Sequence, residues 1–359
     1  MELINFFSDT DESDDDYNEE HNDRVKTLPW IEKYRPKTLN DLISHQHIIN
    51  ALKGFIETKY MPHMLFYGPP GTGKTSTILA CAKELYGTNF NFMVMELNAS
   101  DDRGIEVVRN KVKQFVSSDN AFCRMSMGSK NTNSFKLVIL DETDAMTDDA
   151  QAILRQVVEK YTNNARFCLI CNYIEKINLA LQSRCISFRF APLKKDQIVE
   201  RLEYVVESEK VNITSGGKNS IIKHSKGDMR KVLNMLQSSY MIYDKIDETS
   251  INSCFGYPEQ ETISQIIRYL FTKNIKECCT LIKNTIKDTG ISLSDIITEI
   301  YDYIVMYVVD NNAVVDELTT LSADDIINIL DVIRLIEINQ SANTNEDVQI
   351  GGLVSLFKL

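Results

Sequence analysis

The chain has 359 residues, 43% of them hydrophobic and 25% charged, and a formal net charge of −12 at pH 7. This composition is typical of a soluble globular protein, and the length predicts two or three domains. No apolar run approaches the roughly 20 residues of a membrane span, and the acidic N-terminus lacks the basic start of a secretory signal. The eight cysteines show no framework spacing, which favours reduced thiols in an intracellular compartment.

The first predicted segment is an acidic, disordered tail over residues 1–27. Ten of the 51 carboxylates lie in residues 1–23, which contain no lysine or arginine, and such a charged segment disfavours a packed core. The remaining 41 acidic and 39 basic side chains nearly balance. Any site for nucleic acid must therefore be a local cluster of basic residues rather than a field over the whole surface.

An irregular connector, LPWIEKYRPKTLNDLIS, precedes five short apolar runs that each have the length of a buried strand. The runs are HMLFYG, FMVMELN, KLVILDE, RFCLICN and CISFRF. The segments between the first four have a helical pattern, and strands that alternate with helices imply a mostly parallel sheet covered on both faces. The fold class predicted for residues 28–191 is therefore α/β. Cys168 and Cys171 are three positions apart on one strand, so we expect them on opposite faces rather than on one metal.

From residue 192 onward the pattern is helical. The segment DQIVERLEYVVESEK has one apolar face, and SGGK at 215–218 is expected to interrupt the helices as a loop. Gly227 is expected to end one helix and Asp228 to cap the next. Two strongly periodic segments, LSDIITEIYDYIVMYVV and SADDIINILDVIRLIEIN, predict long helices in the last third of the chain.

The stretch GPPGTGKT at residues 68–75 matches the phosphate-binding pattern GxxxxGK[ST] between a predicted strand and a predicted helix. Its glycines allow successive backbone N–H groups to point at phosphate oxygens, and the start of the following helix favours the anion further. Lys74 adds a point charge for the outer phosphates, and Thr75 offers a hydroxyl to Mg²⁺. The candidate nucleotide-binding residues are Gly68, Pro69, Pro70, Gly71, Thr72, Gly73, Lys74, Thr75 and Ser76.

Polar side chains end two of the buried strands. Asp141 and Glu142 follow KLVIL, and burying carboxylates without a partner is costly. We interpret Asp141, with Thr75, as the Mg²⁺ ligands and Glu142 as the residue that orients and polarises the attacking water. Taken alone, the two acids could simply mark a strand that reaches solvent. Asn172 follows RFCLIC and is a candidate contact for the γ-phosphate or the water, or an ordinary loop-capping residue.

Seven motifs occur in a characteristic order: WIEKYRP, GPPGTGKT, ELNASDDRGIEVVR, LDETDAMTDDAQAILR, LICN, LQSRC and GDMR. In these the chain resembles the small subunits of replication factor C, the sliding-clamp loaders of the AAA+ ATPase family. The motifs span about Leu28 to Gln237, and the last third is similar only in its helical character. The resemblance implies an AAA+ P-loop domain over residues 28–191, a small helical lid over 192–254 and an all-helical collar over 255–359.

The resemblance also implies roles for single residues. Tyr34, Arg35 and Pro36 correspond to the segment that packs near the adenine. Asn172 corresponds to a γ-phosphate sensor, and Arg230 to a second sensor that reaches the phosphates from the lid. Without the resemblance, Arg230 would be interpreted as a solvated helix residue.

Arg184, in LQSRC, corresponds to an arginine finger that acts in trans on the ATP of the adjacent subunit. The alternative is a surface arginine beside a strand. Arg103, Arg109 and Lys176 correspond to positions that contact DNA backbone phosphates without reading sequence. The alternative for these three is isolated salt-bridging residues.

The implied function is that of an ATPase subunit, with ATP and Mg²⁺ as cofactors, which helps open a sliding clamp and load it onto primer–template DNA. The implied partners are the other large and small loader subunits, a clamp of the PCNA type and DNA, with no membrane. The implied location is the nucleus or another site of DNA replication, such as a viral factory. The alternatives are another AAA+ DNA-remodelling ATPase, a checkpoint-type loader variant, or a scaffold subunit that binds ATP without hydrolysing it.

Overall fold

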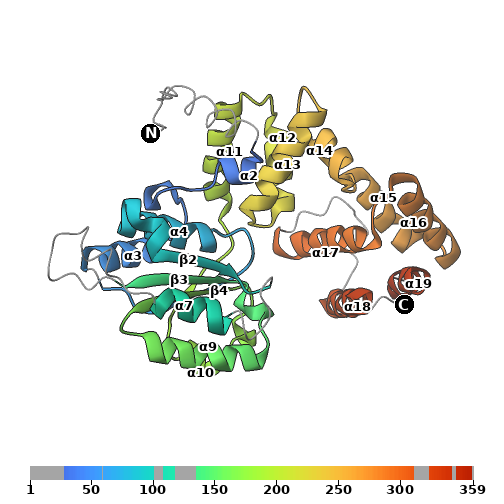
Figure 1. The fold of residues 1–359 in the computed structure, drawn as a ribbon. Coiled ribbons are helices and arrows are strands. Elements are labelled where there is room, and N and C mark those ends of the chain that lie inside the picture. The colour runs from blue at the N-terminus through green and yellow to red at the C-terminus, as the bar shows by residue number, and fades with distance from the viewer. Residues whose placement is uncertain are drawn as a thin grey trace, which may run out of the picture. The chain divides into compact units, whose positions relative to one another are not determined.

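The computed structural model describes residues 28–58, 60–100, 108–117, 135–310, 323–341 and 345–357 (Figure 1). The predicted acidic tail, residues 1–27, lies outside this part. The short helical elements among the described residues are α2 (Trp30–Lys33), η1 (Leu39–Asp41), η2 (Gly87–Asn89), α5 (Phe90–Met93), η3 (Val108–Val112), η4 (Thr143–Ala145) and η5 (Ile174–Lys176).

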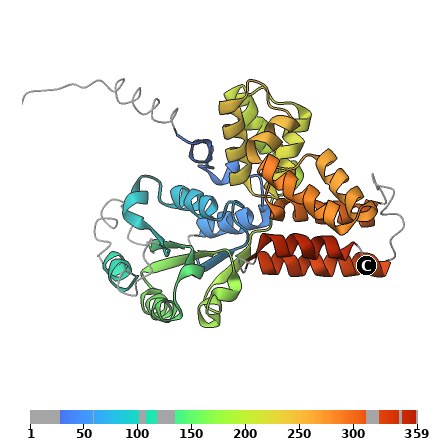
Figure 2. The same cartoon turned by 90° about the vertical axis from the view of Figure 1, so that its right-hand side faces the viewer.

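A five-stranded sheet forms the centre of the N-terminal half, in the order β2-β3-β4-β1-β5 (Figure 1). Every paired neighbour is parallel, which confirms the predicted α/β class. Helices lie on both faces of this sheet (Figure 2). The strands are β1 (Met64–Tyr67), β2 (Val94–Asn98), β3 (Lys136–Asp141), β4 (Ala165–Cys171) and β5 (Ile186–Arg189).

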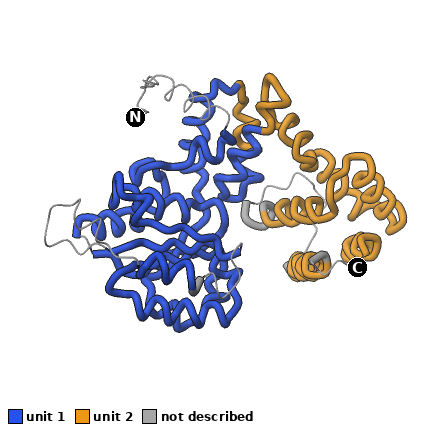
Figure 3. Tube along the Cα trace, viewed as in Figure 1, with its two compact units in different colours: residues 1–211, 221–237 blue, residues 212–220, 238–359 orange. Residues whose placement is uncertain are grey.

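Contacts divide the chain into two compact units (Figure 3). The first comprises residues 1–211 and 221–237, and the second comprises residues 212–220 and 238–359. The predicted domain boundaries at residues 192 and 255 stay a prediction.

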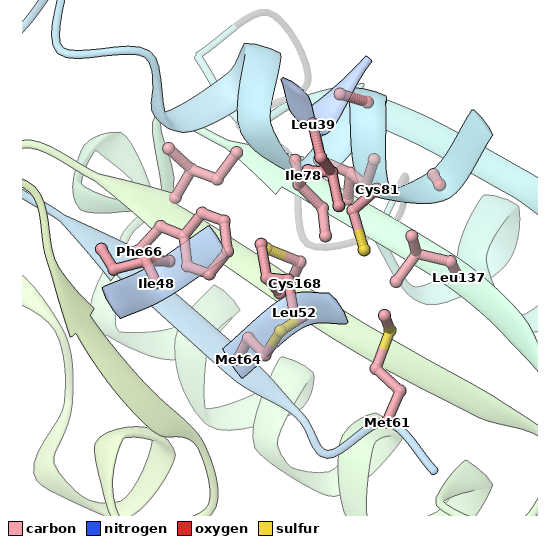
Figure 4. Close-up of a cluster of buried hydrophobic side chains, with 14 of the residues drawn as sticks. Leu39, Ile48, Leu52, Met61, Met64, Phe66, Ile78, Cys81, Leu137 and Cys168 are labelled. Atoms are coloured by element: carbon pink, nitrogen blue, oxygen red, sulfur yellow. The ribbon is translucent and has the colours of Figure 1, made fainter. Parts of the chain in front are cut away.

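The core of the first unit has two halves, one on each face of the sheet. On one face, α3 (Gln46–Thr58) and α4 (Lys74–Tyr86) pack their apolar side chains with Phe66, Leu137 and Cys168 (Figure 4). On the other, α7 (Lys113–Ser117), α9 (Asp148–Tyr161) and α10 (Leu179–Gln182) pack with Cys171 and its neighbours. Cys168 and Cys171 therefore lie on opposite faces, as alternation along a strand requires. The described residues contain no cluster of metal-ligating side chains.

Three helices follow the sheet: α11 (Lys195–Glu209), α12 (Ser215–Ser225) and α13 (Met229–Ile242). Gly227 has φ +88°, and a Cβ there would lie 2.8 Å from the Cβ of Pro192, so only glycine suits this position. Asp228 caps α13, because its Oδ1 accepts from the backbone N–H of Arg230 at 2.8 Å.

The expectation of a loop at SGGK is wrong, because residues 215–218 form the first turn of α12. Thr214 Oγ1 accepts from the backbone N–H of Gly217 at 3.1 Å, which begins the helix. A Cβ at Gly217 would lie 2.9 Å from the carbonyl oxygen of Ile246. The glycine therefore serves a close approach of backbones rather than a turn.

The rest of the second unit is helical (Figure 2). Its core is rich in isoleucine, and α16 and α18 both pack on α19. Asp247, Asn274 and Asn345 cap three of its helices through their side chains. No helix of the described residues is long and apolar enough to cross a membrane. The helices are α14 (Glu248–Phe255), α15 (Gln260–Thr272), α16 (Ile275–Thr289), α17 (Leu293–Asp310), α18 (Ala323–Ser341) and α19 (Glu346–Leu356).

Candidate nucleotide-binding site

The loop between β1 and α4 has a backbone that side chains would not tolerate. Gly68, Gly71 and Gly73 have φ values of +140°, +68° and +94°. A Cβ on Gly68 would lie 2.0 Å from the carbonyl oxygen of Phe190, and one on Gly71 would lie 1.6 Å from Asp228 Oδ1. The loop ends at the N-terminus of α4, where backbone N–H groups have no partner within the helix and favour an anion.

Lys74 is buried at the start of α4, with 8% of its surface exposed. Its Nζ donates to the carbonyl oxygens of Gly68 at 2.8 Å and Pro69 at 3.0 Å, and to Asn172 Oδ1 at 3.0 Å. Burial lowers the pKa of Lys74, Asp141 opposes that shift, and the charge of Arg230 adds to it. All three bonded partners are neutral oxygens, so a phosphate would be a stronger partner for this ammonium group.

Asp141 and Glu142 lie at the carboxyl end of β3. Asp141 Oδ2 accepts from Thr75 Oγ1 at 2.6 Å, and its Oδ1 accepts from the backbone N–H of Glu142 at 2.8 Å. Glu142 is exposed and has φ +54°, a left-handed conformation that is uncommon outside glycine. Such strained residues cluster at functional sites, where the surrounding structure holds them.

Asp144 is a residue of this site that the sequence reasoning missed. Its Oδ2 accepts from the backbone N–H groups of Asn172 and Tyr173, both at 3.2 Å, and so fixes the loop after β4. Thr143, beside it, is 1% exposed and donates its hydroxyl to the carbonyl of Ile170 at 2.8 Å. In the sequence, Asp144 is marked only as the third acid of DETD. Its partners are about thirty residues away, so no local pattern shows its role.

Gln151 is a second residue that was missed. It is 2% exposed, its Nε2 donates to the carbonyl of Lys176 at 2.9 Å, and its Oε1 accepts from the backbone N–H of Asn178 at 2.8 Å. It thus fixes the segment that contains η5. A buried glutamine between two apolar positions of a helix gives no local sign of this role.

A cavity of about 240 Å³ extends from the phosphate loop to the connector. Tyr34, Arg35 and Pro36 line it from the connector, and Arg230 lines it from α13. Arg35 is tied to the start of α4, since its Nε donates to Ser76 Oγ at 3.4 Å. Ten further residues of the predicted nucleotide site line the cavity, whereas Gly68 and Pro69 are not among its lining residues. The ten are Pro70, Gly71, Thr72, Gly73, Lys74, Thr75, Ser76, Asp141, Glu142 and Asn172.

Arg184 is not among the residues that line this cavity. It follows α10, where its guanidinium donates to the carbonyl of Ala180 at 2.6 Å and forms an ion pair with Glu159. The predicted finger is thus separate from the chain's own nucleotide cavity.

Of the three predicted DNA-contacting residues, Arg103 lies outside the described residues. Arg109 falls within η3, and its side chain lies outside the described part as well. Lys176 is exposed in η5, and its Nζ lies 5.0 Å from the centroid of the Tyr173 ring. The proposed cluster of these three side chains therefore stays a prediction.

Three family models match the chain in sequence. The AAA model (ATPase family associated with various cellular activities) matches residues 64–193, an AAA+ ATPase lid domain model (RCF1/5-like) matches 200–241, and the replication factor C C-terminal domain model matches 258–355.

Curated relatives match over nearly the whole chain. Human "Replication factor C subunit 5" is 46% identical over 338 residues, covering 94% of this chain and 93% of the relative. "Replication factor C subunit 3" of Schizosaccharomyces pombe is 44% identical, covering 92% and 91%. Among solved structures, the Thermotoga maritima RuvB Holliday junction branch migration motor has a TM-score of 0.46 and 14% identity, covering 73% of this chain and 88% of that one.

Proposed function

Since the chain belongs to the replication factor C family of AAA ATPases, we propose that it is a clamp-loader subunit that hydrolyses ATP in the cavity between the phosphate loop and the connector. As such a subunit, it helps open a sliding clamp and load it onto primer–template DNA during replication. The observation that carries the proposal of hydrolysis is the convergence of Lys74, Thr75, Asp141, Glu142 and Asn172 on one cavity.

The donor set suits ATP with Mg²⁺. The hydroxyl of Thr75 and the carboxylate of Asp141, already 2.6 Å apart, are hard oxygen ligands of the kind Mg²⁺ prefers. When bound, Mg²⁺ would neutralise charge on the phosphate oxygens. Lys74 supplies a cation that is held in place by neutral partners, and Arg230 supplies a second cation from α13.

In this proposal Glu142 accepts a hydrogen bond from the attacking water and turns its lone pair toward the γ-phosphorus. Asn172, positioned by Asp144 through its backbone, presents its amide to the γ-phosphate or to that water. The γ-phosphoryl group passes to the water oxygen, the bond to the bridging oxygen breaks and the water proton passes to Glu142, which later returns it to the phosphate or to solvent. ADP and phosphate are the products.

The proposed role of Arg184 is to act in trans. The chain offers Lys74 and Arg230 to its own cavity, and Arg184 lies outside it. An arginine supplied by a neighbour stabilises charge on the transferred phosphoryl group and makes hydrolysis depend on assembly. The proposed partners are therefore the other loader subunits, a clamp of the PCNA type, and DNA through Arg103, Arg109 and Lys176. The proposed location is the nucleus or another site of replication.

The alternatives that the sequence left open are less well supported. A branch-migration or origin-recognition ATPase would be expected to carry a winged-helix domain near its C-terminus, where this chain matches the replication factor C C-terminal model. A scaffold subunit that only binds ATP would not need the set of Lys74, Asp141 and Glu142 in one cavity.

Glu142→Gln tests the proposal of hydrolysis. In the assembled loader, single-turnover hydrolysis at this subunit's site is expected to fall by about 10²–10⁴-fold, the usual contribution of a positioned general base. ATP affinity is expected to be retained, because the amide keeps the size of the side chain and leaves the phosphate contacts in place. Glu57→Gln, on the exposed surface of α3, is the control. Hydrolysis at this site that is unchanged in Glu142→Gln would refute the assignment.

A further inference from the structure

Helix α11 contacts the connector through polar side chains, and one of them, Arg201, also lines the cavity. Glu209, 17% exposed, accepts from Lys33 Nζ and from the hydroxyl of Tyr34, both at 2.6 Å. Burial works to raise the pKa of Glu209, but the two donors outweigh it and the pKa is lowered. Burial and the carboxylate of Glu209 together raise the pKa of Tyr34. The carboxylate thus stays charged and keeps both donors.

Arg201 contacts the connector two turns earlier on the same helix. Its Nη2 donates to the carbonyl of Tyr34 at 2.7 Å, and its guanidinium carbon lies 5.0 Å from the centroid of the Tyr204 ring. The rings of Tyr34 and Tyr204 meet edge to face at 6.1 Å. Tyr34 is therefore held at its carbonyl, at its ring and at its hydroxyl, each time by α11.

The far end of the connector is also held by α11. Asp41 accepts from the backbone N–H groups of Lys37 and Thr38, at 3.1 and 2.9 Å. The bond from Thr38 is the main reason that the pKa of Asp41 is lowered, and the charge of Arg201 contributes. Gln197 Nε2 donates to the carbonyl of Ile43 at 3.4 Å. The segment 34–43 is thus fixed at both ends by one helix.

This segment forms part of the wall of the cavity that Lys74 and Asp141 also line. Apolar side chains that suit a purine ring line the same cavity. These are Pro36, Leu42, Ile43, Leu193, Met229 and Leu233. The first three belong to the segment that α11 holds in place.

We infer that Arg201 and Glu209 are positioning residues for the base of the bound nucleotide. They hold the wall against which the base packs and leave the phosphate contacts to other residues. The inference rests on the proposed ATP site. It adds that the affinity of the site for the nucleotide base depends on contacts made by α11. Neither residue is predicted to touch the phosphates.

The test compares ATP with inorganic tripolyphosphate, which has the phosphates but no base. Competition against a fluorescent ATP analogue on the full-length chain gives both affinities. Arg201→Met and Glu209→Leu are each expected to weaken ATP binding about tenfold, which corresponds to ~1.4 kcal/mol. Tripolyphosphate affinity is expected to stay within about twofold, because the phosphate loop is untouched.

Conservative and control variants separate this role from general destabilisation. Arg201→Lys keeps a donor and a charge near Tyr34 and is expected to recover most of the ATP affinity. Glu207→Gln, an exposed position of the same helix, is expected to change neither affinity. If the variants lost affinity equally for ATP and tripolyphosphate, or kept their ATP affinity, this inference would be overturned while the proposed function would stand. A wild-type chain that binds neither ligand would overturn the proposed function as well.

Discussion

At the scale of single residues, His63 is the side chain whose burial has the clearest consequence. It is 9% exposed, its Nδ1 accepts from the backbone N–H of Phe167 at 3.2 Å, and its Nε2 lies 3.4 Å from Thr162 Oγ1. Burial, with a further contribution from the charge of Arg166, lowers the pKa of His63 to about 4. Protonating Nδ1 would also break the bond to Phe167, so the folded protein keeps this ring neutral.

We therefore predict that acid destabilises the fold through His63. Between pH 6.5 and about 4 the unfolded chain binds a proton at this histidine and the folded chain does not. Its contribution to the free energy of unfolding consequently falls as the pH falls, by up to ~1.4 kcal/mol per pH unit. Denaturant unfolding as a function of pH measures this slope.

His63→Asn, which retains an acceptor near the position of Nδ1, should flatten the slope, while the exposed control His47→Asn should not. Equal slopes for His63→Asn and the wild type would contradict the assignment.

Arg184 gives the second prediction at this scale. Because it lies outside the chain's own cavity, Arg184→Ala should leave this subunit's ATP affinity unchanged. Hydrolysis at the neighbouring subunit's site should fall by about 10³-fold or more, the range found for arginine fingers. The measurement uses mixed assemblies in which nucleotide binding is abolished in all subunits but one. Lys160→Ala, an exposed basic residue of α9, is the control. A loss confined to this subunit's own site would exclude the finger, and no loss at either site would favour a structural role with Glu159.

At the scale of elements, the start of α13 lies directly against the phosphate loop. The backbone N–H of Met229 donates to the carbonyl of Gly71 at 3.2 Å, and Asp228 occupies the space where a side chain on residue 71 would be. The same Asp228 caps the helix that carries Arg230. The packing of Gly71 against the start of α13 therefore determines where the phosphate loop, the helix start and Arg230 lie.

We predict that Gly71→Ala displaces Asp228 and, with it, Arg230. Lost capping should lower the free energy of unfolding by about 1–2 kcal/mol, and ATP affinity should fall. The double variant Gly71→Ala, Asp228→Ala should be less destabilised than the sum of the two single variants, because the second change removes the clash. Gly54→Ala, in the middle of α3 with nothing within 4 Å of its Cβ position, should be neutral or stabilising. Additive effects in the double variant would show that the two residues do not interact.

The elements also show why sequence reasoning succeeded in some places and failed in others. The five strands were predicted from their apolar runs, and β1, β3 and β4 are indeed buried, whereas β2 and β5, at the two edges of the sheet, are partly exposed. The cap at Asp228 was predicted because capping is local. Asp144 and Gln151 were missed because their partners are distant in sequence and belong to the backbone, which carries no signal of residue type. The helix at SGGK was missed because its glycine serves a tertiary approach to Ile246, which resembles a turn signal in sequence.

At the scale of the whole molecule, charge separates the acidic tail from a nearly neutral body. A body without a general positive field can hold DNA only through local phosphate contacts, and such contacts suit the proposed action at any primer–template junction. Of the predicted contacts, Lys176 is exposed in a segment fixed by Gln151. The prediction that Arg103 and Arg109 contact DNA phosphates rests on the resemblance to the small subunits of replication factor C.

Clamp loading itself tests the proposed function most directly. A loader assembled from its partner subunits, with and without this chain, is given ATP, its cognate clamp and primed circular DNA, and the clamps retained on the DNA are counted. Loading is expected only when this chain is present, and it is expected to be weaker with Lys74→Ala, which removes the cation of the phosphate loop. Equal loading in the absence of this chain would contradict its role as a clamp-loader subunit.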